Sequence, residues 1–324
     1  MNRRQLAALL AASVAMPAVA RAQGAWPSRP VTLLVPFAAG GSNDITARLI
    51  APHLEARLGQ PFVVENRPGG GGSLGMGMVA RGRPDGSVFL VSSASNHVFH
   101  PLVSGELGYD VRDALAGVSI VADVPNVLAA HPGFGVTDVQ GLIAKVRATR
   151  GGVSYASSGV GTSNHLAGEL FRLRTGLELT HVPYRGGGPA LNDLVAGTVP
   201  IGFMNLPTVV PPASDGRVRI LAVCTAERVS IRRDLPTVTE QGVPDFAIRS
   251  WMGIFAPRGT PAPIIERLAT AVRESLALPQ VAGRLVAIGS EPLLMPPAET
   301  DAFVRQEFDR WAPVVRAAGI STQG

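Results

Sequence analysis

The chain has 324 residues, of which 16% are charged, and its formal net charge is +5. A charged fraction well below the usual ~25%, without any Lys/Arg-rich run, argues against a nucleic-acid-binding protein. Three arginines and no acidic residue precede residue 23, so the remaining chain has a formal net charge of only +2. A chain of this length is large for a single core, which favours two lobes.

The first 22 residues have the pattern of a secretory signal peptide. The basic pair Arg3-Arg4 precedes an apolar stretch, Leu6–Val19, and the segment Ala20–Ala22 fits the small-x-small cleavage rule. Because the apolar stretch is too short to span a bilayer, an uncleaved membrane anchor is the weaker alternative. We expect cleavage before Gln23 and export to the periplasm, by either the general or the twin-arginine route.

Strand and helix patterns alternate along the rest of the chain. Short apolar, β-branched runs predict strands at Val31–Val35, Phe62–Val64, Val88–Val91, Val118–Ala122, Val127–Ala130, Val153–Ala156, Ile201–Phe203 and Ile220–Val223. Helical patterns occupy about 45–58, 74–80, 138–147, 164–174, 189–195, 261–276, 279–288 and 299–318. This alternation is typical of an α/β fold whose mainly parallel sheets are flanked by helices.

We expect the chain to pass from one lobe to the other at two segments. The chain passes from the first lobe to the second near Ala122–Pro125, and it returns through the extended stretch Phe246–Phe255. We therefore expect one lobe from residues 23–124 and 247–324, a second from residues 125–246, and a hinge of two strands between them.

A strand that runs into a glycine- and serine-rich loop and then into a helix occurs twice. The loops are Ala38–Asp44 and Ser158–Ser163. Such a loop leaves backbone N–H groups free at the positive end of the helix dipole, which suits an anion. In parallel sheets, ligands bind beyond the carboxyl ends of the strands, where both loops lie. We expect the two loops, one from each lobe, to bind one carboxylate from both sides.

Other motifs give little support for a cofactor or a metal. Gly70–Gly75 matches a dinucleotide-binding pattern, but the acidic residue expected about 20 residues further on is missing, so a tight turn is the better interpretation. The only lysine, Lys145, does not follow a glycine, which excludes a phosphate-binding P-loop. His97 and His100 have no third ligand close in sequence, and we interpret them as polar loop or hinge residues. Cys224 lies in an apolar strand pattern and is interpreted as a core residue.

Serine hydrolysis is the alternative from another functional class. Ser42, Ser158 and Ser163 lie in suitable loops, and His165 follows within one turn, but the G-x-S-x-G elbow is missing. Capping of helix N-termini is the simpler role for Ser42, Thr162 and Ser163, and it is compatible with ligand binding.

Two neighbouring residues, Tyr184 and Arg185, each have two possible roles. Arg185 either pairs with a second carboxylate of a ligand or stays solvated, as most exposed arginines do. Tyr184 either lines a cleft or covers the core.

Eight short segments form a specific combination in a fixed order. They are Trp26–Pro30, Val35–Asp44, Val64–Gly69, Pro84–Gly86, Gly161–Glu169, His181–Gly186, Leu235–Val238 and Ala256–Pro261. Together they resemble the Bug family of extracytoplasmic solute receptors, the substrate-binding proteins of tripartite tricarboxylate transporters. The resemblance covers the chain that follows the signal peptide.

The resemblance implies a two-lobed periplasmic binding protein of type II that closes on a small carboxylate. It implies a monomeric, non-catalytic receptor without cofactor or metal, whose partners are integral-membrane transporter subunits or, alternatively, a membrane signalling kinase. The ligand-binding residues that it implies are Phe37, Ala39, Gly40, Gly41, Ser42, Asp44, Ser95, Ser158, Gly159, Val160, Gly161, Thr162, Ser163, His165, Tyr184 and Asn205.

Two departures from the family pattern bear on the ligand. Met204 stands where relatives commonly carry an acidic residue, and Val160 is apolar where relatives often have a polar one. Both changes make the far part of the pocket less polar, which favours an aromatic or long-chain carboxylate over citrate.

Overall fold

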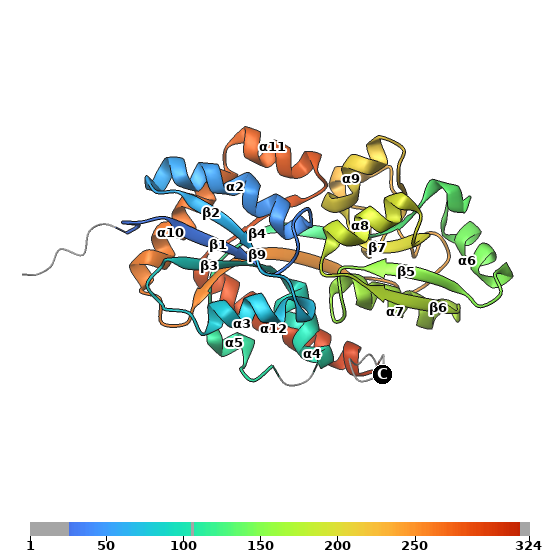
Figure 1. The fold of residues 1–324 in the computed structure, drawn as a ribbon, viewed down its shortest axis with the longest axis horizontal. Helices are drawn as coiled ribbons and strands as arrows, with labels where there is room; N and C mark the ends of the chain where they lie inside the picture. The colour runs from blue at the N-terminus through green and yellow to red at the C-terminus, as the bar shows by residue number, and fades with distance from the viewer. Residues whose placement is uncertain (1–25, 105–106, 318–324) are drawn as a thin grey trace, which may run out of the picture.

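The computed structural model describes residues 26–104 and 107–317 (Figure 1). The predicted signal peptide lies outside these residues. The strands are β1 (Val31–Val35), β2 (Phe62–Asn66), β3 (Val88–Ser93), β4 (Leu115–Ala130), β5 (Val153–Ser157), β6 (Leu179–Pro183), β7 (Ile201–Asn205), β8 (Arg219–Val223), β9 (Arg249–Pro257) and β10 (Glu291–Met295).

Helices of eight residues or more alternate with these strands. They are α2 (Ser42–Leu58), α3 (Ser73–Ala80), α6 (Val139–Ala148), α7 (Ser163–Thr175), α8 (Gly187–Ala196), α9 (Leu206–Ser214), α10 (Ala262–Leu276), α11 (Pro279–Ala287) and α12 (Pro297–Ala317). Shorter helical turns are η1 (Gly70–Gly72), η2 (Ser95–Phe99), α4 (His100–Ser104), α5 (Val111–Ala114), η3 (Pro132–Phe134) and η4 (Ser230–Arg232).

The strands form two parallel groups joined through two long strands. We use lobe 1 for the predicted unit of residues 23–124 and 247–324, and lobe 2 for that of residues 125–246. In lobe 1, the strand order is β2-β1-β3 with parallel pairing, and in lobe 2 it is β6-β5-β7, also parallel. Between them lie β9 and β4, which pair antiparallel with each other and with β3 and β7 respectively. This arrangement confirms the predicted α/β fold of mainly parallel strands flanked by helices.

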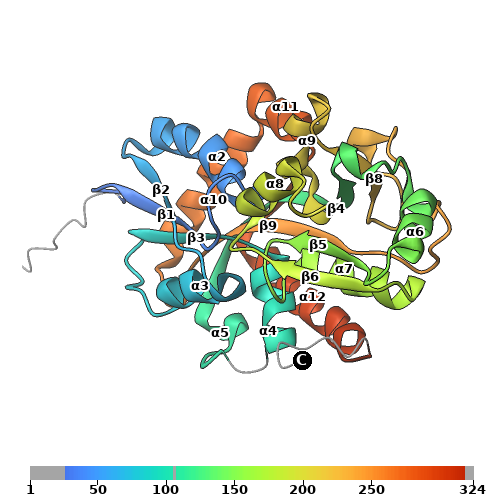
Figure 2. The same cartoon turned by 45° about the vertical axis from the view of Figure 1, so that its right-hand side comes forward.

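The long strand β4 belongs to both lobes (Figure 2). Its residues Leu115–Pro125 pair with β9, whereas Asn126–Ala130 pair with β7 and β8. The sequence predicts two separate strands here, and this prediction is wrong because the chain continues as one buried strand through Pro125. The change of pairing partners lies beside the predicted crossing at Ala122–Pro125, so it supplies a structural basis for the lobe boundaries, which stay a prediction.

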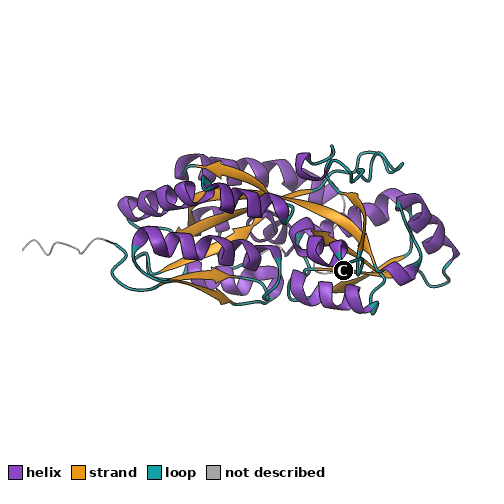
Figure 3. Cartoon of the chain, turned by 90° about the horizontal axis from the view of Figure 1, so that it is seen from above, coloured by secondary structure: helices purple, strands orange, loops and turns teal. Residues whose placement is uncertain are grey.

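Helices cover both faces of the strands (Figure 3). On one face of lobe 1, α2 and α10 pack against the strands through Ile50 and Val272. In lobe 2, α8 packs through Leu194. On the opposite face, one apolar cluster extends from lobe 1 to lobe 2 and contains both Phe99 and Phe171. The lobes therefore share a continuous core on this face.

Two residues that the sequence assigns to a polar loop are in fact helical. His97 lies in η2 and His100 begins α4, directly after it. His97 is fully buried, and its ring stacks on Phe255 with centroids 3.9 Å apart, so it belongs to the core. Cys224 is buried as predicted, and burial raises the pKa of its thiol.

Candidate ligand-binding site

The first glycine-rich loop joins β1 to α2 and is held by a carboxylate of its own lobe. Asp44 accepts hydrogen bonds from Gly40 N, Arg48 Nε and Asn66 Nδ2, each at 3.0 Å. Burial alone would raise the pKa of Asp44, but these hydrogen bonds outweigh it and hold the pKa below its usual value. Gly41 precedes α2 and has no side chain to cap it, so backbone N–H groups at this helix end depend on other partners.

The second loop joins β5 to α7 and is held by neutral side chains. The Thr162 hydroxyl caps α7 by accepting from His165 N (3.3 Å), and it donates to Gly159 O (2.7 Å). His165 Nδ1 accepts from Gly161 N (3.2 Å), which requires a neutral ring. Burial lowers the pKa of His165, and its stacking partner His181 has a pKa lowered to about 3 by burial and by the adjacent His165.

A cluster of buried polar side chains joins the lobes at the start of α7. Ser163 N donates to Ser95 Oγ (3.1 Å), and Asn126 Nδ2 donates to Ser163 Oγ (3.0 Å). Ser158 Oγ donates to Asn164 Oδ1 at 2.5 Å. The second polar atom of each carboxamide, Asn126 Oδ1 and Asn164 Nδ2, is buried without a partner among the described residues. Because an unpaired buried polar atom is costly, these two atoms are candidate ligand contacts.

Each glycine-rich loop packs against a glycine-rich segment of the other lobe. A Cβ atom on Gly188 of lobe 2 would lie 2.1 Å from Ala39 O, in the first loop. A Cβ atom on Gly71 of lobe 1 would lie 2.6 Å from Val160 O, in the second loop. Both approaches are closer than any side chain permits, so the two glycines allow the lobes to come together.

Two hydrogen bonds cross between the lobes beside these close approaches. Ala38 N donates to Arg185 O (3.0 Å), and the Nδ1 atom of His100 lies 3.3 Å from Val160 O. A carbonyl only accepts, so His100 Nδ1 carries the hydrogen. Burial lowers the pKa of His100, although the bond to Val160 acts in the opposite direction. The structure therefore shows the two lobes in contact, with both glycine-rich loops at their interface.

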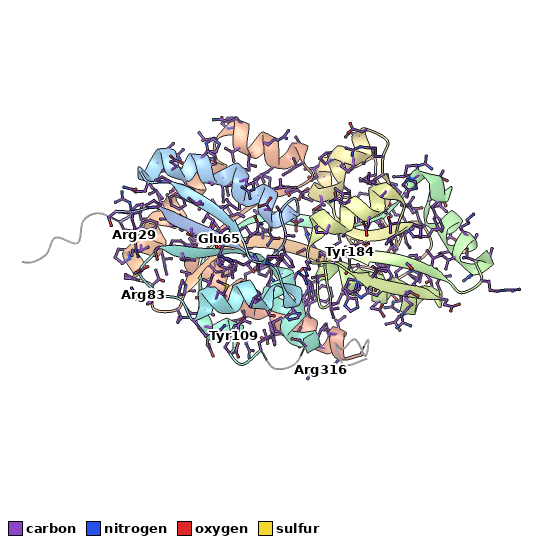
Figure 4. All side chains as sticks on the ribbon, viewed as in Figure 1. Arg29, Glu65, Arg83, Tyr109, Tyr184 and Arg316 are labelled. Carbon is purple, nitrogen blue, oxygen red and sulfur yellow. The ribbon has the colours of Figure 1, made fainter. Side chains whose placement is uncertain are left out.

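A cavity of about 480 Å³ lies between the lobes, beside the second glycine-rich loop and next to Phe37, the residue that precedes the first loop. We call it the interlobe cavity, and its lining residues are Phe37, Gly69, Gly70, Gly71, Gly72, His100, Ser104, Ser158, Gly159, Val160, Pro183, Tyr184 and Arg185. The Tyr184 hydroxyl donates to Asp193 Oδ2 (2.6 Å), and burial together with Asp193 raises the pKa of Tyr184 to about 12. Figure 4 shows Tyr184 at the side of lobe 2 that faces lobe 1.

The structure distributes fifteen of the sixteen expected site residues over three places. Those that line the interlobe cavity are Phe37, Ser158, Gly159, Val160 and Tyr184. Those in the second loop or the polar cluster around it are Ser95, Gly161, Thr162, Ser163 and His165. Those at the first loop are Ala39, Gly40, Gly41, Ser42 and Asp44, and the sixteenth, Asn205, pairs in register with Asn126 of β4.

Several residues at this interface are not among those expected from the sequence. They are His100, Asn126, Gly69–Gly72 and Gly186–Gly188. The glycine runs can be seen in the sequence. However, neighbouring residues suggest only a dinucleotide-binding motif or a tight turn as their role. Their use as partners for loops of the other lobe depends on tertiary contacts alone.

Two of the serines considered for hydrolysis, Ser158 and Ser163, are hydrogen-bonded to carboxamide side chains. Ser158 Oγ donates to Asn164 and Ser163 Oγ accepts from Asn126, so neither is paired with a histidine. Within residues 26–104 and 107–317, His, Cys, Asp and Glu form no group of three suited to a metal ion. In the same part of the chain, helices fall short of the length and apolarity that crossing a membrane requires.

Two α/β lobes that share paired strands, with glycine-rich loops at their interface, are the architecture of the periplasmic binding proteins that this structure is similar to. Residues 46–320 match the family described as "Tripartite tricarboxylate transporter family receptor". The chain belongs to this family, and the resemblance to Bug receptors is confirmed.

Individual relatives agree with this assignment over nearly the whole chain. Protein BugT of Bordetella pertussis is 37% identical, with 98% of this chain and 99% of that protein covered. The structure of R. palustris Rpa4515 with adipate is 40% identical with a TM-score of 0.88, covering 91% of this chain and 99% of that one. The periplasmic binding protein BugD is 33% identical with a TM-score of 0.87, covering 91% and 99%.

Proposed function

We propose that the protein is a periplasmic receptor that captures a small carboxylate between its lobes and delivers it to a membrane transporter. The observation that carries this proposal is the position of the two glycine-rich loops, each at the start of a helix and each against the opposite lobe. One cavity is lined by Phe37, which precedes the first loop, and by Ser158, which begins the second. The adipate bound to R. palustris Rpa4515 supports a carboxylate as the ligand.

Main-chain groups supply most of the proposed binding energy. Neither loop contains lysine or arginine, so the carboxylate is held by backbone N–H groups and by the positive ends of α2 and α7. Charge-assisted hydrogen bonds contribute about 1.5–3 kcal/mol each. A few of them, less the cost of closing the lobes, give the −8 kcal/mol or so of micromolar binding. Asp44 acts indirectly in this proposal, because its carboxylate holds Gly40 and Arg48.

Closure of the lobes couples binding to delivery. The ligand bridges the two lobes and so stabilises the form in which Ala38 contacts Arg185 and His100 contacts Val160. Strands β4 and β9 connect the lobes and act as the hinge. The membrane partner then distinguishes the closed form from the open one. No chemical step on the ligand is needed.

A ligand screen on the purified protein tests this function. Adipate, malate, hexanoate, benzoate and aspartate are each added in a thermal-shift assay, and positive results are confirmed by calorimetry. Dimethyl adipate is the matched control without a carboxylate. We expect at least one acid to raise the melting temperature, because it binds the native state only, and we expect the ester to have no effect. An ester that binds as well as its acid, or hydrolysis of the ester by the protein, contradicts the proposal.

A further inference from the structure

We propose that the contact between Glu291 and Ser230, which we call the latch, stabilises the closed arrangement of the lobes and raises the affinity for the ligand without touching it. The inference rests on the proposed function, because it concerns the closure that accompanies ligand binding. Glu291 is singled out by its bonds to the other lobe, by the residues that hold its carboxylate, and by its position outside the interlobe cavity.

Glu291 joins the two lobes through a charged group. It begins β10 in lobe 1, and its Oε1 atom accepts hydrogen bonds from the backbone N–H (3.2 Å) and the hydroxyl of Ser230, which begins η4 in lobe 2. The other side-chain hydrogen bonds between the lobes come from Ser95 and His100. Within residues 26–104 and 107–317, Glu291 is therefore the one carboxylate, lysine or arginine side chain that bonds across the lobes.

Arg249 holds the carboxylate of Glu291 in place. Asp123 of β4 and Glu291 are directly opposite each other in the strand register, and two like charges in that arrangement repel. Arg249 compensates both charges, because it donates to Asp123 at 2.5 and 2.6 Å and its Nη2 atom lies 3.9 Å from Glu291 Oε2. These three residues belong to lobe 1, whereas Ser230 belongs to lobe 2. A rotation of the lobes thus separates Glu291 from Ser230 and leaves the group around Arg249 intact.

The latch lies apart from the proposed ligand contacts. A second cavity of about 520 Å³ lies beside it and is lined by Glu291, Ser230, Arg249 and other residues of both lobes. This second cavity and the interlobe cavity have no lining residue in common. A substitution of Glu291 therefore leaves the glycine-rich loops and the residues around them unchanged, and it acts on binding only through closure.

The expected size of the effect follows from the exposure of the latch. The Glu291 side chain is 27% exposed and Ser230 is exposed, so water competes for their hydrogen bonds. We expect the latch to shift the equilibrium between open and closed lobes by about three- to tenfold, above an ordinary surface ion pair and below a buried charged hydrogen bond. The dissociation constant should change by the same factor, because the ligand bridges both lobes.

Calorimetry and stopped-flow kinetics with the acid that binds most tightly in the screen test the proposal. The proteins are the wild type, Glu291→Ala, Ser230→Ala and the double variant, with Glu266→Ala as the control because Glu266 is an exposed carboxylate on α10. Removal of a negative charge by itself favours an anionic ligand, so Glu266→Ala should bind at least as tightly as the wild type. Glu291→Ala should instead bind about three- to tenfold more weakly, through faster dissociation.

Ser230→Ala should lose only part of this affinity, because its backbone N–H still donates. The double variant should lose no more than Glu291→Ala, since both substitutions remove one contact. The proposal is overturned if Glu291→Ala binds as tightly as Glu266→Ala, or if the two single losses multiply in the double variant. Acids that bind all these proteins equally refute the latch and leave the receptor function standing.

Small-angle scattering without ligand tests the latch independently of any acid. We expect Glu291→Ala to have a larger radius of gyration than Glu266→Ala, because fewer of its molecules are closed. If no acid of the screen binds, the receptor function is refuted, and the scattering alone decides on the latch. In that case an equal radius of gyration for the two variants overturns it.

Discussion

Replacing Gly161 with alanine should weaken ligand binding more than it weakens the fold. Gly161 has φ of +74°, and a Cβ atom there would lie 2.7 Å from Nδ1 and 3.1 Å from the Cα atom of His100, across the interface between the lobes. The left-handed backbone costs an alanine roughly 1–2 kcal/mol in any state of the lobes. The contact with His100 exists only in the closed state, because His100 belongs to lobe 1 and Gly161 to lobe 2.

Gly176→Ala is a matched control for this substitution. Gly176 ends the same helix, α7, with φ of +65°, and a Cβ atom there would meet nothing within 4 Å. Both variants should therefore lose a similar ~1–2 kcal/mol of unfolding free energy. Only Gly161→Ala adds overpacking of about 1–3 kcal/mol to the closed state, which raises the dissociation constant roughly five- to 150-fold.

The assay combines denaturant unfolding without ligand and calorimetry with adipate or the acid of the screen that binds most tightly. Equal dissociation constants for the two variants would contradict this expectation, because they would show that the second loop does not approach His100 in the bound state. A dissociation constant raised in both variants alike would refute it too, since the backbone strain alone would then explain the loss.

Further substitutions test the remaining contacts. Gly188→Ala places a Cβ atom 2.1 Å from Ala39 O, so calorimetry should show loss of binding while circular dichroism shows a folded protein. Asp44→Asn should lower the unfolding free energy by about 1–3 kcal/mol above pH 4, and the difference from wild type should shrink as pH falls through the lowered pKa of Asp44, because protonation removes the same charge. The pKa of His181 is lowered from 6.5 to about 3 in the folded protein, so on acidification the unfolded chain takes up a proton before the folded one. The unfolding free energy of the wild type should therefore decrease as the pH falls below 6.5, and that of His181→Gln should decrease less steeply. Thr162→Ala removes the cap of α7 and should cost ~1 kcal/mol in a urea titration, and no change would contradict the assigned cap.

The elements that could be predicted from the sequence are those with a strong local period. The strand Val31–Val35 has the predicted bounds, and the helix at Asn164–Arg174 extends by only one residue at each end, because apolar periodicity and flanking glycines act locally. Strand β6 has a weak local signal, because apolar and polar residues are mixed in Leu179–Pro183 at an edge of the sheet. The signal for α9 is weak because its nine residues include three prolines. Pro125 suggests a break in β4, yet neighbouring strands on both sides keep the strand continuous.

The candidate site was predictable in kind but not in its partners. A glycine-rich loop before a helix identifies an anion-binding backbone from a few adjacent residues. Nothing local indicates that Gly71 faces Val160, that His100 donates across the interface, or that Asn126 reaches Ser163. Those contacts join residues about 40 to 90 positions apart, and they follow from the way β4 and β9 bring the lobes together.

A crystal structure of the protein with its bound acid would show directly how the carboxylate is held. We expect one carboxylate to lie between the starts of α2 and α7 and to accept hydrogen bonds from backbone N–H groups of both glycine-rich loops. A carboxylate bound to one lobe only, or held elsewhere by arginine side chains alone, would contradict it.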